Sequence, residues 1–165
     1  MQLKKHNEVV TSLQDLDKIK QIILSKKWVI HKSSNSSANS FFNSNLTPNE
    51  VLFFNDLFKE YKNNYIDEND IHDVIFERAY INCHPSHHPG DWHTDNEYGF
   101  TLIYYPVSEV DFKNEGGIDI ENNYEPYTSN SLCIFPANLK HRASMHTLVG
   151  TLRYSIAFKY QTKNN

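Results

Sequence analysis

The spacing of apolar positions changes along the chain, from a helical period in the first half to a strand-like period in the second. In TSLQDLDKIKQIILSKKW the apolar side chains recur three or four residues apart and fall on one face of a helix; they are Leu13, Leu16, Ile19, Ile22 and Ile23. Ser12, followed by Asp15, provides a weak signal for the helix N-terminus. This stretch therefore predicts an amphipathic helix.

A second helix is predicted in TPNEVLFFNDLFKEYKN. Thr47 can cap its first turn, Pro48 suits the first helical position, and Glu50 can reach back to the cap. Its apolar stripe consists of Val51, Phe54, Leu57, Phe58 and Tyr61. The segment before it, residues 31–45, is rich in Ser and Asn and offers little to bury besides Phe41 and Phe42, so a mobile loop is expected there.

From Val74 onward, short runs of β-branched and aromatic residues predict strands. They are VIFERAYINC, FTLIYYPV, GIDI, SLCIFP and LRYSIAFKY, separated by clusters of Gly, Pro, Asn and Asp. No amphipathic helix fits between them, which argues against a parallel βαβ sheet. We expect a mainly β protein of the α+β class, an antiparallel sandwich or jelly roll with the two helices packed outside. All 165 residues would form one domain, with 1–73 as a helical accessory region and 74–162 as the β core.

Composition narrows the functional classes. The formal net charge of −4 gives no overall attraction to nucleic acid or to an anionic membrane. No run approaches the roughly 20 apolar residues of a membrane span, and the N-terminus lacks the apolar segment of a secretory signal. Cys83 and Cys133 lie in strand-like runs and are interpreted as buried thiols of a reducing compartment. We therefore expect a cytoplasmic protein, or a viral protein acting in a host cytoplasm.

His93 and Asp95 are candidate metal ligands, because side chains two residues apart on a strand point to the same face. The third ligand would come from another strand, where His141 and His146 are available. His146 stands only seven residues before Arg153, which is short for a turn and a return strand, so His141 is preferred. Two histidines and one carboxylate leave three positions open, as suits Fe(II) that must also bind a co-substrate and O₂.

Two further features complete the candidate site. Arg153 would be costly to bury at the floor of a barrel unless a carboxylate met it, and Ser155 lies on the same strand face. Tyr105 and Thr101 share one face of the run TLIYYPV, and the Tyr105 hydroxyl could reach the same carboxylate. The His-rich stretch CHPSHHPGDW, with His84, His87 and His88, is interpreted as a solvated rim rather than a second metal site.

The order of these features resembles the Fe(II)/2-oxoglutarate-dependent dioxygenases, in particular the prolyl 4-hydroxylase-like branch. The similar segments are HTDN, TLIYYPV, EGGIDI, SLCIFPANLKHR and GTLRYSIAFKY, within residues 78–160. The resemblance implies a double-stranded β-helix in which His93, Asp95 and His141 hold iron. It also implies that Arg153 binds 2-oxoglutarate, with Tyr105, Thr101 and Ser155 as further co-substrate residues.

The activity implied by the resemblance is hydroxylation of a C–H bond with O₂ and 2-oxoglutarate, releasing succinate and CO₂. No catalytic residue beyond the metal centre is implied, and ascorbate is a candidate additional cofactor. The leading substrate is a peptidyl prolyl residue or another protein side chain, followed by a free amino acid or small metabolite. A non-catalytic jelly-roll binding module and a cupin-like metalloenzyme without 2-oxoglutarate remain open; the latter would keep the metal ligands but would not need Arg153.

Overall fold

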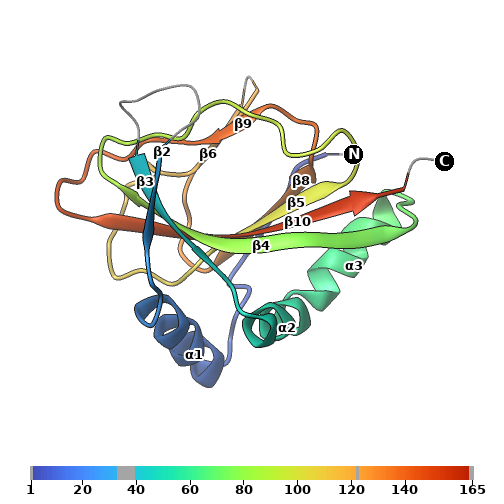
Figure 1. Cartoon of the computed structure of the whole chain (residues 1–165), viewed down its shortest axis with the longest axis horizontal. Coiled ribbons are helices and arrows are strands. Elements are labelled where there is room, and N and C mark those ends of the chain that lie inside the picture. The colour runs from blue at the N-terminus through green and yellow to red at the C-terminus, as the bar shows by residue number, and fades with distance from the viewer. Residues whose placement is uncertain (1, 33–39, 122, 164–165) are drawn as a thin grey trace.

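Two antiparallel β-sheets face each other, with helices covering the outer side of the larger one (Figure 1). The computed structural model describes residues 2–121 and 123–163 except 33–39. Seven strands form the large sheet, in the order β1 (Lys4–Asn7), β8 (Ser131–Pro136), β5 (Phe100–Tyr105), β10 (Leu152–Thr162), β4 (Val74–Pro85), β3 (Ser40–Asn45) and β2 (Val29–Lys32). The small sheet consists of β7 (Asn123–Glu125), β6 (Ile118–Ile120) and β9 (His141–Ala143). The predicted antiparallel jelly roll is confirmed.

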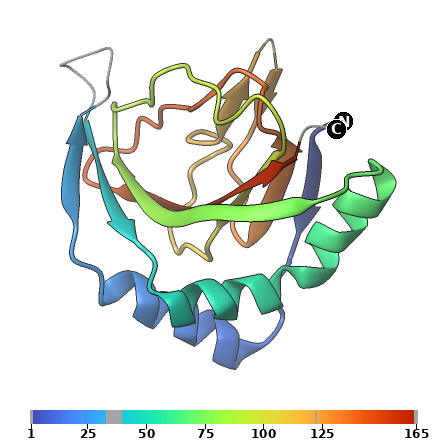
Figure 2. The ribbon, with the colours of Figure 1, turned by 45° about the vertical axis from the view of Figure 1, so that its right-hand side comes forward.

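The helices are α1 (Leu13–Leu24), α2 (Pro48–Leu57) and α3 (Lys59–Glu68), and Figure 2 shows them along one side of the large sheet. Their start signals act as predicted. The Ser12 side chain accepts a hydrogen bond from the backbone N–H of Asp15, and Thr47 and Glu50 form a complete capping box. The predicted second helix is two helices, because the backbone at Phe58 departs from helical geometry (φ −102°, ψ 8°). In the described ranges, no helix is long and apolar enough to cross a membrane.

The expected mobile loop at 31–45 is wrong for the part that the structure describes. Ser40–Asn45 is strand β3, paired with both β2 and β4, and residues 33–39 lie outside the described part. The Asn43 side-chain amide donates to the Asn82 side-chain oxygen at 2.8 Å across β3 and β4. Pairing with a distant strand thus overrides the loop-like composition, which carries no local strand signal. Strand β1 in the expected helical region has the same origin, since it pairs with β8.

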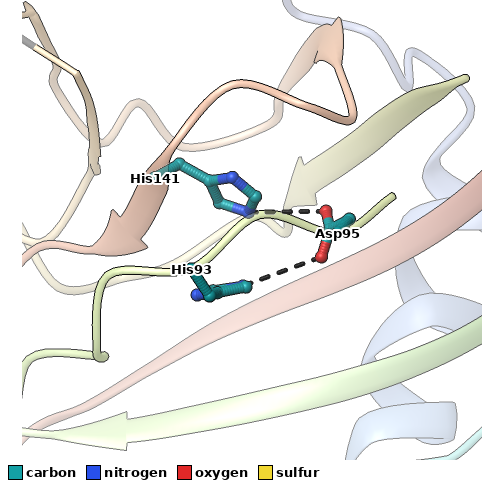
Figure 3. A group of neighbouring side chains, drawn as sticks. All are labelled: His93, Asp95 and His141. Atoms are coloured by element: carbon teal, nitrogen blue, oxygen red, sulfur yellow. Dashed lines mark ion pairs between the residues drawn. The ribbon is translucent and has the colours of Figure 1, made fainter. Parts of the chain in front are cut away.

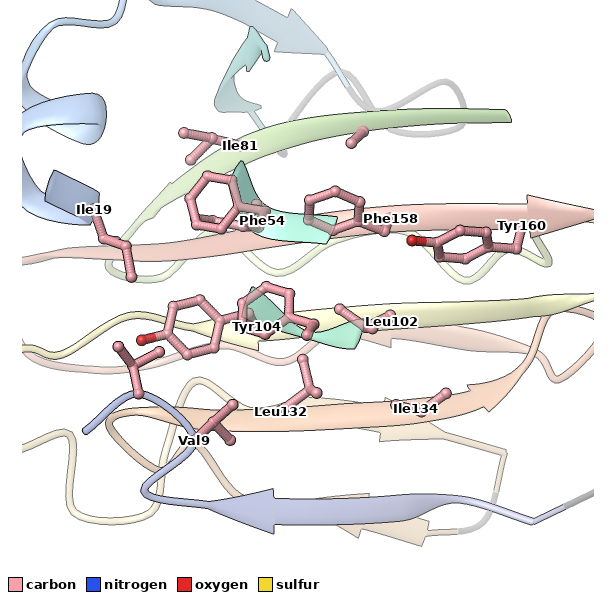
Figure 4. Close-up of a cluster of buried hydrophobic side chains, with 14 of the residues drawn as sticks. Val9, Ile19, Phe54, Ile81, Leu102, Tyr104, Leu132, Ile134, Phe158 and Tyr160 are labelled. Carbon is pink, nitrogen blue, oxygen red and sulfur yellow. The ribbon is translucent and has the colours of Figure 1, made fainter. Parts of the chain in front are cut away.

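The hydrophobic core lies between the helices and the outer face of the large sheet (Figure 4). Phe54 and Phe58 pack edge-on against Phe158 of β10, with ring centroids 6.0 and 6.2 Å apart. Side chains alternate along β10, so Ile156, Phe158 and Tyr160 enter this core. The alternate positions line a cavity on the inner face; they are Arg153, Ser155, Ala157 and Lys159. One strand therefore serves the core with one face and the candidate site with the other.

Candidate metal and co-substrate site

A cavity of about 550 Å³ opens between the two sheets. Strands β3, β4, β5 and β10 of the large sheet provide one wall, and β6 and β9 of the small sheet contribute to the other, together with residues 90–95. His93, Asp95 and His141 line this cavity along with Arg153, Tyr105 and Ser155. The structure thus places six of the seven predicted site residues in one space, and the seventh, Thr101, contacts Asp95 directly.

Three potential ligand atoms converge in this cavity, one each from His93, Asp95 and His141, and all lie within 4.8 Å of one another (Figure 3). The Nε2 atom of His93 is 3.7 Å from Oδ1 of Asp95, and Nε2 of His141 is 3.4 Å from Oδ2. Asp95 and His141 are almost fully buried, whereas the side chain of His93 is 49% exposed. The triad therefore has one open side, toward the mouth of the cavity.

The predicted strand at His93 and Asp95 is wrong, because neither residue lies on a strand, so strand alternation does not explain why their side chains converge. His93 forms an isolated bridge with His141, with both backbone N–H groups donating across it at 3.0 and 2.9 Å. The N–H of Asp95 donates to the carbonyl of Ala137 at 2.9 Å. The irregular segment that carries the two residues is thus tied directly to β9 and to the turn before it, and this pairing brings His141 to them.

Both histidines have a fixed ring orientation. Nδ1 of His93 is 2.8 Å from the carbonyl oxygen of Asp91, and Nδ1 of His141 is 2.8 Å from that of Leu139. A carbonyl oxygen only accepts, so each Nδ1 carries a proton and donates it to the carbonyl, which leaves Nε2 as the nitrogen available to a metal ion. This hydrogen-bonding arrangement is typical of metal-binding histidines.

Electrostatics keep the triad in the state that a cation needs. Burial pushes the pKa of Asp95 upward, but Lys159 and His141 nearby, with hydrogen bonds from Lys159 and Thr101, outweigh it, so its pKa lies below the usual value. Burial is the main cause that lowers the pKa of His141 to about 4. At neutral pH the carboxylate is therefore charged and the His141 imidazole is neutral.

Arg153 sits in the same cavity with unused hydrogen-bonding capacity. It is 1% exposed, and its Nε and one terminal nitrogen have no hydrogen-bond partner in the described part of the chain. Its guanidinium lies 5.8 Å from the ring centroid of the buried Tyr105. Gly116 (φ +70°) lies against it, since a Cβ atom there would be 2.9 Å from the Arg153 Cδ. A buried cation with free donors is ready to bind a carboxylate.

The two remaining predicted residues, Ser155 and Thr101, lie at different ends of the site, one near Arg153 and the other near the metal triad. Ser155 lies beside Arg153 on the inner face of β10. Thr101 instead donates its hydroxyl to Asp95, so it belongs to the metal end. His146 is buried away from the triad, with Nε2 3.2 Å from the carbonyl of His84, which supports the preference for His141.

The interpretation of His84 as part of a solvated rim is wrong. His84 is 3% exposed, lines the cavity in register with Arg153, and stacks on Phe41 at 4.8 Å. Sequence reasoning also missed Lys159, whose ammonium bonds the Asp95 carboxylate. The sequence did contain a signal for Lys159. It lies an even number of residues after Arg153 and Ser155, so on a strand it points to the same face as they do.

These residues fit a ferrous ion and a dicarboxylic co-substrate. Two imidazoles and one carboxylate form the donor set that suits non-haem Fe(II) with open positions. The unpartnered nitrogens of Arg153 offer a bidentate site for a carboxylate deeper in the same cavity.

No family model matches the chain, and no curated protein matches it in sequence. Solved structures do match it. A 2OG-Fe(II) oxygenase family oxidoreductase from Burkholderia pseudomallei aligns with a TM-score of 0.74 and 11% identity, over 99% of this chain and 86% of that one. A Trichoplax adhaerens prolyl hydroxylase in complex with a hypoxia inducible factor peptide fragment gives 0.65 and 12%, over 97% and 83%.

A third solved structure, HygX from Streptomyces hygroscopicus with nickel, 2-oxoglutarate and hygromycin B bound, aligns with a TM-score of 0.68 and 8% identity, over 98% of this chain and 83% of that one. At these identities the likeness concerns the fold. It confirms, at that level, the resemblance seen in the sequence: this chain has the fold of the 2OG-Fe(II) oxygenases.

Proposed function

We propose that the protein is an Fe(II)- and 2-oxoglutarate-dependent dioxygenase that hydroxylates a C–H bond and forms succinate and CO₂. The observation that carries this proposal is that one cavity holds both the His93–Asp95–His141 triad and the buried Arg153, two of whose nitrogens have no hydrogen-bond partner among the described residues. In this proposal residues 1–165 form one dioxygenase domain. Region 1–73 adds helices and strands β1–β3, and region 74–162 carries the metal and co-substrate residues.

Each residue of the site has a separate task. His93, Asp95 and His141 would hold the iron, which with 2-oxoglutarate and O₂ supplies the oxidising chemistry. Arg153 binds the distal carboxylate of 2-oxoglutarate, Tyr105 donates its hydroxyl to the same group, and Ser155 lies beside them. Thr101 contributes through Asp95, to which it is hydrogen-bonded. The apolar side chains of Ile103, Ile118 and Ala157 line the cavity and limit the access of water to the co-substrate.

The leading substrate is a peptidyl prolyl residue or another protein side chain. The cavity supports a substrate with both apolar and amide character, because Trp92 and Tyr80 line it together with the carboxamides of Asn43, Asn45 and Asn82. The similar prolyl hydroxylase was solved with a peptide. The runner-up is a free amino acid or small metabolite, since HygX of the same fold was solved with hygromycin B.

Arg153 argues against two alternatives, a non-catalytic binding module and a metalloenzyme that does not use 2-oxoglutarate. A pure binding module has no use for a buried guanidinium beside a metal triad that leaves two nitrogens without a hydrogen bond from the described residues, because such a group costs free energy. A metalloenzyme independent of 2-oxoglutarate has no use for it either.

The test is succinate production by the protein supplied with Fe(II), 2-oxoglutarate, O₂ and ascorbate. A panel of proline-containing peptides, free amino acids and small metabolites is screened for stimulated turnover, and products are checked by mass spectrometry for one added oxygen atom. We expect one substrate class to raise succinate formation. Absence of both 2-oxoglutarate binding and succinate formation would refute the proposal.

A further inference from the structure

We propose that Lys159, together with Thr101, is a positioning residue that keeps Asp95 a one-oxygen metal ligand and so preserves an open coordination position. This inference rests on the proposed function, because it concerns the metal that the triad would hold. It assigns a task to a buried lysine that the metal triad and the Arg153 end of the cavity leave unexplained.

The two oxygens of Asp95 have different surroundings. Oδ2 accepts hydrogen bonds from the Lys159 ammonium and from the Thr101 hydroxyl. Oδ1 receives no hydrogen bond from the residues that the structure describes and lies 3.7 Å from Nε2 of His93, while Oδ2 also lies 3.4 Å from Nε2 of His141. The side chains of Lys159 and Asp95 are only 3% and 2% exposed, so water does not weaken this ion pair. One oxygen is therefore already committed to the protein, and the other is free to bind a metal ion.

The fold gives Lys159 a fixed place. Its Cα lies opposite that of Thr101 on β5 and that of Arg78 on β4, so both strands flank it. The register of β10 against β4 shifts between Lys159 and Tyr160, and such bulges commonly redirect a side chain next to a site. The Lys159 ammonium also lies 3.5 Å from the Thr101 hydroxyl oxygen and 5.9 Å from the ring centroid of Tyr80. These contacts hold the ammonium at Oδ2 of Asp95.

The number of Asp95 oxygens on the metal matters for the chemistry. Three single-atom protein ligands leave three positions on a six-coordinate ion, two for the chelating co-substrate and one for O₂. A carboxylate that bound through both oxygens would occupy one of those positions. An oxygen that already accepts two hydrogen bonds, one of them from an ammonium, is a poor second donor to a cation. Lys159 and Thr101 therefore act on the open positions through Asp95.

The experiment uses the full chain loaded with Mn(II), a redox-inert probe whose bound waters are counted by electron-nuclear double resonance in ¹⁷O-labelled water. Without co-substrate, the wild type is expected to hold three waters on the ion. Lys159→Met and Thr101→Val are each expected to lose one water, because Oδ2 loses one of its two hydrogen bonds and becomes a better donor to the metal. Lys159→Arg restores an Oδ2 hydrogen bond and is expected to restore the third water. Lys59→Met, on the exposed side of α3, is the matched control and should keep three waters.

The outcomes separate this inference from the proposed function. Variants that bind Mn(II) with an unchanged water count would overturn the positioning role, even if their melting temperatures fall, since a purely structural ion pair predicts that result. A wild-type protein that binds no Mn(II) would instead overturn the metal site itself. If Lys159→Met fails to fold, Thr101→Val still decides, because it removes one hydrogen bond to Oδ2 and leaves the ammonium in place.

Discussion

Replacing Arg153 by Met should separate binding of the co-substrate from stability of the fold. Methionine fills much of the space of the arginine stem but has no donor for a carboxylate. In the absence of co-substrate the wild-type guanidinium is buried with two nitrogens that have no partner in the described ranges, and a buried polar group left unsatisfied costs about 1–3 kcal/mol. The free energy of unfolding of the metal-free variant is therefore expected not to fall, in contrast to most changes at a fully buried side chain.

Affinity for 2-oxoglutarate should change strongly in the same variant. Removing one partner of a buried, hydrogen-bonded charge pair costs about 2–5 kcal/mol. At roughly 1.4 kcal/mol per factor of ten, the dissociation constant should rise about 30- to 4,000-fold. Binding of 2-oxobutyrate, which keeps the keto acid end but lacks the distal carboxylate, should be unchanged.

The assay is calorimetric titration of Mn(II)-loaded protein under argon with the two acids in turn. Arg142→Met is the matched control, because this arginine pairs with Asp119 at 2.7 Å, stacks on Trp92 and does not line the cavity. Arg153 does not bind the distal carboxylate if Arg153→Met changes the affinity for 2-oxoglutarate less than about threefold, or if it weakens binding of both acids equally.

Three further predictions concern the metal, the buried His84 and the helix cap. Asp95→Asn should weaken Mn(II) binding, measured by metal titration, by more than the roughly 10- to 100-fold that is typical when a residue hydrogen-bonded to a ligand is changed. An affinity near that of the wild type would show that Asp95 is not a metal ligand. Burial, then Arg153, holds the pKa of His84 well below 6.5, so the unfolded state binds more protons below that pH and stability falls as pH falls. Between pH 7.5 and 5.5 the unfolding free energy, measured with urea, should fall by about 1.4 kcal/mol because of His84. The same pH dependence in His84→Asn would show that His84 is not its cause. Thr47→Ala should lower the unfolding free energy by about 1 kcal/mol through loss of the capping box; no change would show that the cap is dispensable.

Features encoded within a few residues were predictable from the sequence. The starts of α1 at Ser12 and of α2 at Thr47 depend on hydrogen bonds between residues three positions apart, and the residue types at those positions can be identified in the sequence. The two faces of β10 follow from strict alternation, and Arg153 falls on the cavity face as expected.

Features created by pairing of distant segments were not predictable in the same way. Strand β3 has a loop-like composition and becomes a strand because β4 provides its hydrogen bonds. His93 and Asp95 converge as expected, but through a bridge to His141 rather than through a strand of their own. The burial of His84 in register with Arg153 depends on the pairing of β4 with β10. Neither partner alone reveals any of these contacts.

Anaerobic titration of the Fe(II)-loaded protein with 2-oxoglutarate shows whether three side chains hold one iron to which the co-substrate chelates. We expect a weak visible charge-transfer band that saturates at one 2-oxoglutarate per iron, is absent in Asp95→Asn, and in Arg153→Met appears only at higher 2-oxoglutarate concentration. A wild-type protein that binds iron and 2-oxoglutarate without developing the band would contradict this expectation.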